Sequence, residues 1–108
     1  MNTVIARETF LAKTPGEPVF EITLEIGTPY PVEGEDGIWS CPVHMPALNF
    51  DSCHVVGQGS LQALSMALMT ARMALASFCE KGGILSYAAD SGEPIGDKGL
   101  RAIFGVSQ

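Results

Sequence analysis

The most constraining feature of this sequence is segment 60–81, which runs for 22 residues without a glycine or proline and predicts one long helix. At about 100° per residue, two apolar stripes appear on this helix. The first contains Leu61, Leu64, Leu68, Ala71, Leu75 and Phe78, and the second, on the far side, contains Met66, Met69 and Met73. A surface helix normally has one apolar stripe and one polar face. We therefore expect something to cover both sides of this helix.

The Met stripe has two competing explanations. In the first, Gln62, Met66, Met69 and Met73 form an interface with a second copy of the chain or with another protein, and Arg72 adds to a polar rim. In the second, the C-terminal tail of the same chain covers the methionines with Ile84, Leu85, Ile95 and Phe104. Flexible methionine side chains suit either surface, so the sequence leaves both explanations open.

Composition narrows the class of protein. At 108 residues with 46% hydrophobic residues, the chain is expected to form a single domain over residues 1–108 with a modest core. Twelve acidic against six basic residues give a net charge of −6. This balance argues against nucleic acid or an anionic membrane as a partner. The N-terminus lacks the apolar run of a signal peptide, and three cysteines suggest free thiols, so we expect a cytoplasmic protein.

The hydropathy pattern predicts an α+β fold. Strands are expected at 3–12, 20–26, 38–47 and 52–56, and the first two are joined by a Pro15-Gly16 turn. Residues 27–37 and 90–99 resemble loops, 84–87 a short extended piece and 100–104 one helical turn. Pro42 would place the third strand at an edge or a bulge. The predicted architecture is a four-stranded antiparallel meander packed on one long helix, with a short C-terminal tail.

Two motifs give the chain a family resemblance. Residues 37–42 read Gly-Ile-Trp-Ser-Cys-Pro, and residues 60–64 read Ser-Leu-Gln-Ala-Leu. The chain resembles a functionally uncharacterised family of short bacterial proteins with a Gly-x-Trp-x-Cys-Pro strand and this helix start, over roughly residues 20–97. The family pattern favours Asp where this chain has Gly59, which leaves Gly59 or Ser60 to cap the helix. The resemblance implies a shared fold and no activity.

Four potential zinc ligands lie close together in the sequence. Cys41, His44, Cys53 and His54 have the residue types of a tetrahedral zinc site. However, strand alternation points the cysteines toward the face that carries Trp39 and the histidines toward the opposite face. Four ligands of one ion must converge, so we expect no metal and no other cofactor.

Three functional hypotheses remain. The first is a small cytosolic protein that acts through the long helix, as a homo-oligomer or by binding another protein. The second is a binding module for a small apolar ligand held between helix and sheet near Trp39. The third is an enzyme that uses Cys41 or loop carboxylates; these are Glu33, Glu35, Asp36, Asp90, Glu93 and Asp97. Cys41 lies in an apolar pattern and the carboxylates lie in loops, so the sequence favours a protein that is not an enzyme.

Overall fold

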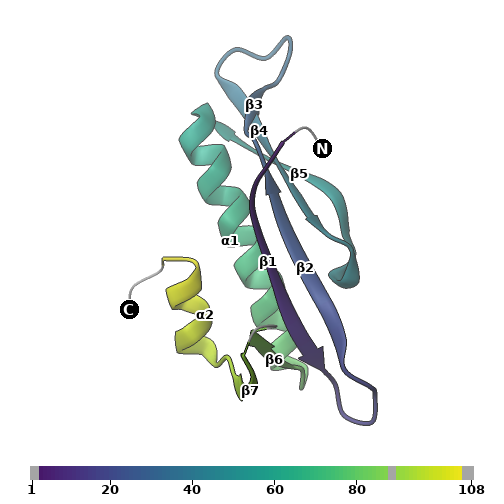
Figure 1. Cartoon of the computed structure of the whole chain (residues 1–108). Helices are drawn as coiled ribbons and strands as arrows, with labels where there is room; N and C mark the ends of the chain where they lie inside the picture. Colours follow the sequence, from purple (N-terminus) through teal and green to yellow (C-terminus); the bar gives the residue numbers. More distant parts are fainter. Residues whose placement is uncertain (1–2, 88–89, 106–108) are drawn as a thin grey trace.

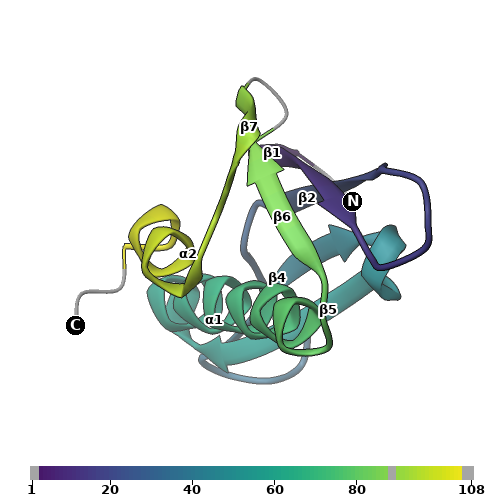
Figure 2. The same cartoon turned by 90° about the horizontal axis from the view of Figure 1, so that it is seen from below.

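The computed structural model describes residues 3–87 and 90–105 of the chain. The fold has two layers, with one antiparallel sheet on one side and two helices on the other (Figures 1 and 2). The long helix α1 (Gly59–Glu80) runs along the sheet, and the short helix α2 (Asp97–Ile103) lies beside it. The α+β class and the long helix are therefore as predicted.

Within residues 3–87 and 90–105 the sheet has seven strands instead of the four expected. Its strands are β1 (Val4–Lys13), β2 (Phe20–Gly27), β3 (Tyr30–Pro31), β4 (Ile38–Met45), β5 (Phe50–Gln58), β6 (Ile84–Tyr87) and β7 (Asp90–Pro94). Strands β1, β2, β4 and β5 form the predicted meander. Strand β6 then pairs with the free edge of β1, and β7 pairs with β6. Residues 84–87 were predicted to be extended, but their pairing with β1 was not, because pairing to a distant edge leaves no local signal in a four-residue strand.

Pro42 lies in a central strand, so of the two predicted positions, an edge or a bulge, the edge was wrong. A register shift between β4 and β5 lies close by, between Val43 and Met45. Strand β4 pairs with β5 on one side and with β2 and β3 on the other. The Ile38 carbonyl accepts a hydrogen bond from Val32 on the β3 side, and strand alternation directs the Pro42 nitrogen to that same side. On that side of β4, Pro42 lies between the residues that pair with β2 and those that pair with β3. Neither strand therefore needs a hydrogen bond from the N–H group that Pro42 lacks. Residues 27–37, which were expected to form a surface loop, contain the short strand β3.

Helix α1 approaches the sheet through small side chains. The residues on α1 that are fully buried are Ala63, Ala67, Ala71 and Leu75, whereas Leu61 is 76% exposed. Leu64 and Leu68 are half-buried and flank this stripe. The predicted Leu stripe was therefore wrong at Leu61, while Ala71 and Leu75 are fully buried and Leu64, Leu68 and Phe78 pack against the core as predicted. The stripe lacked Ala63 and Ala67, because hydropathy favours large residues while close contact with a sheet favours alanine.

The start of α1 also differs from the prediction. Its N-cap is Gln58, not Gly59 or Ser60, and no side chain of the cap residue completes it. Instead the Gln62 side-chain oxygen accepts a hydrogen bond from the Gln58 amide. This contact satisfies one of the donors that a helix start leaves free. The helix ends as predicted at the glycine pair, where Gly82 has φ +99°.

The C-terminal segment is structured instead of being a simple tail. Residues 90–99, expected as a loop, contain β7 and the start of α2. The Leu85 carbonyl accepts a hydrogen bond from the Ile95 amide, and Leu100 anchors α2 with 3% exposure. The extended piece at 84–87 and the helical turn near residue 100 are confirmed as β6 and α2.

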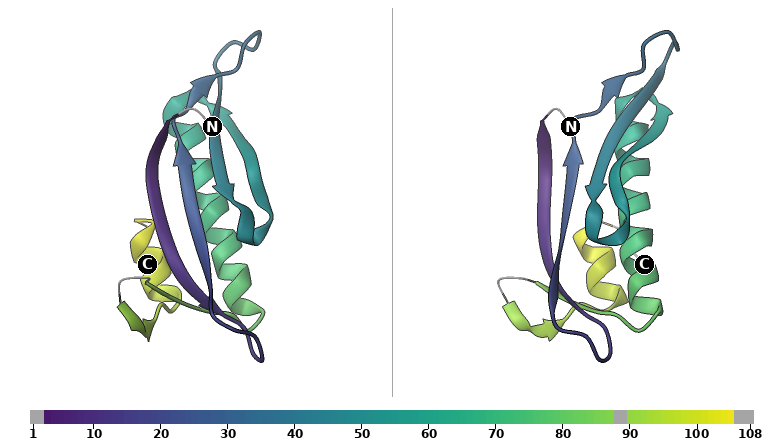
Figure 3. Two further views of the ribbon diagram at one scale, coloured as in Figure 1. Left: turned by 45° about the vertical axis from the view of Figure 1, so that its right-hand side comes forward. Right: turned by 90° about the vertical axis from the view of Figure 1, so that its right-hand side faces the viewer.

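The two helices leave part of the sheet loosely covered. A helix with its side chains is about 10 Å wide and neighbouring strands are about 4.8 Å apart, so one helix covers roughly two strands. Helix α1 lies directly against β4 and β5, while β1 and β2 diverge from it toward the side where α2 lies (Figure 3). This arrangement leaves space between the β1–β2 hairpin and the helices.

Candidate functional site

The methionine stripe of α1 lies on the outer surface, as the interface hypothesis requires. Met66, Met69 and Met73 are 37%, 40% and 57% exposed. By helical geometry they lie on the side of α1 turned away from its buried alanines. Gln62 shares this side and uses its side-chain oxygen at the helix start. The four residues predicted for the interface thus form one surface, here called the Met face.

The C-terminal segment does not cover the Met face in the part of the chain that the structure describes. Leu85 is fully buried in the core, and Ile84 is 53% exposed at the edge of the sheet. Phe104 lines a small pocket together with Leu68 and Met69, and neither Met66 nor Met73 lines that pocket. The tail-cover explanation is therefore wrong for Met66 and Met73, because α2 packs on a different side of α1.

Helix α1 also has the length and apolar composition of a membrane span. Core helices of soluble proteins pass the same test, so this observation is weak. In the structure the alanine side of α1 packs against the sheet. The expectation that membranes are not a partner stays a prediction.

The four candidate zinc ligands lie apart in the described structure. Cys41 and Cys53 face the core, whereas His54 is exposed and hydrogen-bonds through Nδ1 to the Tyr30 hydroxyl at 2.8 Å. His44 lies 3.4 Å from a carboxylate oxygen of Asp51. Among the residues that the structure describes, no group of three His, Cys, Asp or Glu side chains could hold a metal ion.

Tyr30 and His54 form a polar bridge on the outer face of the sheet. Tyr30 pairs beside Ser40 and His54 pairs opposite Pro42, so their 2.8 Å contact crosses over β4. Beneath it Ser40 is only 2% exposed, and its hydroxyl has no hydrogen-bond partner within the described part of the chain. The bridge lies over Ser40 and Pro42, which explains why these two residues are buried although they lie on the outer face of the sheet.

The cysteines have the properties of core residues. Cys41 is fully buried and its thiol donates a hydrogen bond to the Gly27 carbonyl at 3.4 Å. Burial raises the pKa of the Cys41 thiol, and burial likewise raises the pKa of the Cys79 thiol. A nucleophilic cysteine needs a lowered pKa, so neither environment favours nucleophilic catalysis. All three cysteines are free thiols.

The candidate loop carboxylates do not converge. Glu33, Glu35 and Asp36 are exposed on the β3–β4 loop, and Glu93 is exposed on β7. The side chains of Asp90 and Asp97 fall outside the described part of the structure. The described carboxylates show no paired arrangement for acid–base chemistry.

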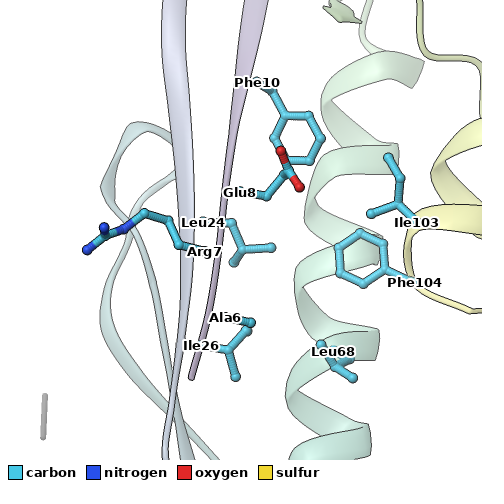
Figure 4. A pocket seen from close by; sticks show the side chains of 9 residues that line it. All are labelled: Ala6, Arg7, Glu8, Phe10, Leu24, Ile26, Leu68, Ile103 and Phe104. Atoms are coloured by element: carbon cyan, nitrogen blue, oxygen red, sulfur yellow. The ribbon is translucent and has the colours of Figure 1, made fainter. Parts of the chain in front are cut away.

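A cavity that sequence reasoning missed lies between the β1–β2 hairpin and the helices. It has a volume of about 210 Å³. Its lining is mainly apolar and comprises Ala6, Arg7, Glu8, Phe10, Leu24, Ile26, Leu68, Ile103 and Phe104 (Figure 4). Trp39, which the ligand hypothesis placed beside the site, instead packs against the core away from this lining.

Glu8 is the acidic residue of the cavity. It pairs with Leu24 and shares the inward phase of Phe10, so its side chain lies on the core side of the sheet. Figure 4 shows its carboxylate inside the cavity and the Arg7 side chain turned away. Arg7 instead donates a hydrogen bond to Glu25 at 2.7 Å on the outer face. The signal was present in the sequence, since Glu8 stands two positions before Phe10.

Comparison with known proteins identifies a family and no activity. A family model described as a domain of unknown function (DUF6968) matches residues 6–96. No curated protein and no solved structure matches the chain. The matched range includes α1, the Met face and all of the sheet except the first two residues of β1, and it ends before α2.

Proposed function

Because the chain belongs to this family of unknown function, we propose a function from its own surface: it is an interaction module that pairs with a second copy of itself through the Met face. The observation that carries the proposal is the exposure of Met66, Met69 and Met73 along one side of a helix. A row of exposed methionines on a soluble chain is an unfavourable apolar patch unless a partner covers it.

Two-fold symmetry makes the Met face self-complementary. A 22-residue helix is about 33 Å long, and two antiparallel copies can pair about an axis at the level of Ala71. Met69 and Met73 are equally distant from this level, so each opposes the other across the axis. Met66 then meets the small side chain of Ala76, which fits a large residue against a small one.

The ends of the same surface are polar and complementary. Gln62 and Glu80 are nine residues from the level of the axis in opposite directions, so they also oppose each other. The Gln62 oxygen already accepts the hydrogen bond from the Gln58 amide, which leaves its side-chain N–H groups to donate to the Glu80 carboxylate of the second copy. This pair supplies the polar rim that stable interfaces have.

Charge supports a second copy over a charged partner. The chain carries a net charge of −6, yet the Met face has no acidic residue between Gln62 and Met73. Two copies can therefore approach here without placing like charges opposite each other. A cytoplasmic location is part of the proposal, supported by three free thiols. The net charge argues against nucleic acid and anionic membranes as partners.

Sedimentation velocity over a concentration series tests the proposal. We expect wild type to sediment as a dimer and Met69→Lys/Met73→Lys to sediment as a folded monomer, because burying lysine charges opposes pairing. The matched control is Val19→Lys/Val56→Lys, which adds the same charges at two 57% exposed positions outside the Met face. The control should remain dimeric. A wild type that stays monomeric at every concentration contradicts the proposal.

A further inference from the structure

The cavity beside α2 has the composition of a ligand site with one charged anchor. Its floor is formed by Phe10, Leu24 and Ile26 from the sheet, and its helix side by Leu68, Ile103 and Phe104. In Figure 4 the Ile103 and Phe104 side chains point from α2 toward the strands. Small-molecule sites typically combine such an apolar lining with a few polar groups that orient the ligand.

Glu8 is the group that orients a ligand here. Its carboxylate lies within the cavity (Figure 4), and Glu8 as a residue is partly buried. Among the described residues, Glu8 makes no hydrogen bond or salt bridge, although Arg7 next to it forms an ion pair with Glu25 on the other face. A partly buried carboxylate without a protein donor is best satisfied by a donor that carries positive charge.

We propose that this cavity binds a small apolar amine, with the alkyl or aryl part among the apolar side chains and the protonated amine on the Glu8 carboxylate. An amine of this class is cationic at neutral pH, as lysine is, and supplies charged N–H donors. A carboxylic acid would place a like charge beside Glu8, and an alcohol would supply only a neutral hydrogen bond. The charge of the site thus selects the head group.

The cavity volume limits the size of the ligand. A dry apolar cavity of about 150 Å³ accommodates benzene in another protein, so a cavity of about 210 Å³ suits a molecule of about eight heavy atoms. Hexylamine, with seven heavy atoms, is therefore a suitable probe. The site lies on a different side of α1 from Met66 and Met73, so it does not depend on the proposed pairing.

Binding can be measured by ¹⁵N NMR titration with hexylamine, hexanol and hexanoate, which share a chain and differ in head group. We expect saturable hexylamine binding at neutral pH, with shift changes at the amides of residues 6–10, 24–26 and 103–104. Hexylamine should bind at least about tenfold more tightly than hexanol, the usual scale of a hydrogen bond to a charged group. Hexanoate should bind more weakly than hexanol.

Glu8→Gln isolates the head-group interaction. In this variant hexylamine should lose about tenfold in affinity and match hexanol, while unchanged hexanol binding reports an intact cavity. The matched control, Glu33→Gln, removes the same charge from an exposed loop and should keep the preference for the amine. If Glu8→Gln fails to fold, the relative affinities of wild type for hexylamine, hexanol and hexanoate still show whether the site prefers a cationic head group.

Three outcomes would overturn the proposal. The first is equal affinity of wild type for hexylamine and hexanol. The second is a preference for the amine that persists in Glu8→Gln. The third is the absence of saturable binding, or shift changes that lie away from β1, β2 and α2. The first two outcomes exclude the role of Glu8, and the third excludes the cavity as the binding site.

Discussion

Replacing Gly57 by alanine should destabilise the protein strongly, because α1 lies too close to β5 at this position. A Cβ atom at Gly57 would lie 2.7 Å from the Ala63 nitrogen, 2.9 Å from the Gln62 carbonyl carbon and 3.0 Å from the Ala63 Cα. All three are backbone atoms, so no side-chain rotation relieves the contact. The start of α1 must instead move away from the sheet.

The magnitude follows from what that movement disturbs. Overpacking a well-packed core costs about 1–3 kcal/mol, and a clash against backbone places this variant at the upper end, about 3 kcal/mol. The shift separates the helix from the sheet near Ala63 and Ala67, both fully buried. For a chain of this size, such a loss lowers the melting temperature by roughly 10–20 °C.

Urea unfolding followed by far-ultraviolet circular dichroism measures the effect. The control is Gly96→Ala, since a Cβ at Gly96 would have no atom within 4 Å, and as an N-cap change it should cost about 1 kcal/mol or less. An unfolding free energy for Gly57→Ala within 1 kcal/mol of wild type would refute the close approach of α1 to β5.

The other predictions concern packing, thiols and metal. Leu75→Ala should cost about 2–5 kcal/mol because Leu75 is fully buried, whereas Leu61→Ala should change stability by about 0.5 kcal/mol or less, as measured by urea unfolding. The Cys41 and Cys79 thiols, whose pKa values are raised by burial, should react slowly with Ellman's reagent until the chain unfolds. Elemental analysis after dialysis should find no stoichiometric zinc; about one zinc per chain would contradict the opposed placement of the cysteines and histidines.

Hydropathy patterns within a single segment of the chain were enough to predict strand β2 and helix α1. Alternation between Phe20 and Ile26 predicted β2, and the absence of glycine and proline predicted α1. The extended piece at 84–87 was predicted, but its place in the sheet was missed because β6 pairs with β1, which is far away in the sequence. Pro42 was predicted to lie at an edge or a bulge, because the interruption between β2 and β3 that accommodates it in a central strand is visible only in the fold.

In the candidate sites, too, the features set by local sequence were predicted and the features set by distant contacts were missed. Helical periodicity placed Met66 and Met73 on the far side from the Leu stripe and left open whether the tail covers them. Of the residues facing the sheet, Ala71 and Leu75 were predicted, while Ala63 and Ala67 were missed because hydropathy gives alanine less weight than leucine. Glu8 was missed because the cavity around it requires α2, whose position no local pattern specifies. Its inward phase relative to Phe10 was the one sequence signal that pointed to it.

A charge-exchange experiment tests the central claim, pairing of two copies through the Met face, most directly. Met69→Glu and Met73→Lys are made in separate chains. Each alone should be a folded monomer, since its homodimer would oppose a charge to a methionine twice. When the two variants are mixed, a heterodimer can form. In it the introduced Glu at position 69 opposes the introduced Lys at position 73 of the other chain, and the two remaining methionines oppose each other.

Sedimentation velocity and native mass spectrometry should therefore find a heterodimer in the mixture and monomers in each separate sample. This result requires positions 69 and 73 to oppose each other across a two-fold axis, as the proposed geometry states. A mixture that remains monomeric, while wild type is dimeric and both variants are folded, would contradict pairing in this register. Dimers in either separate variant would place the interface away from the Met face.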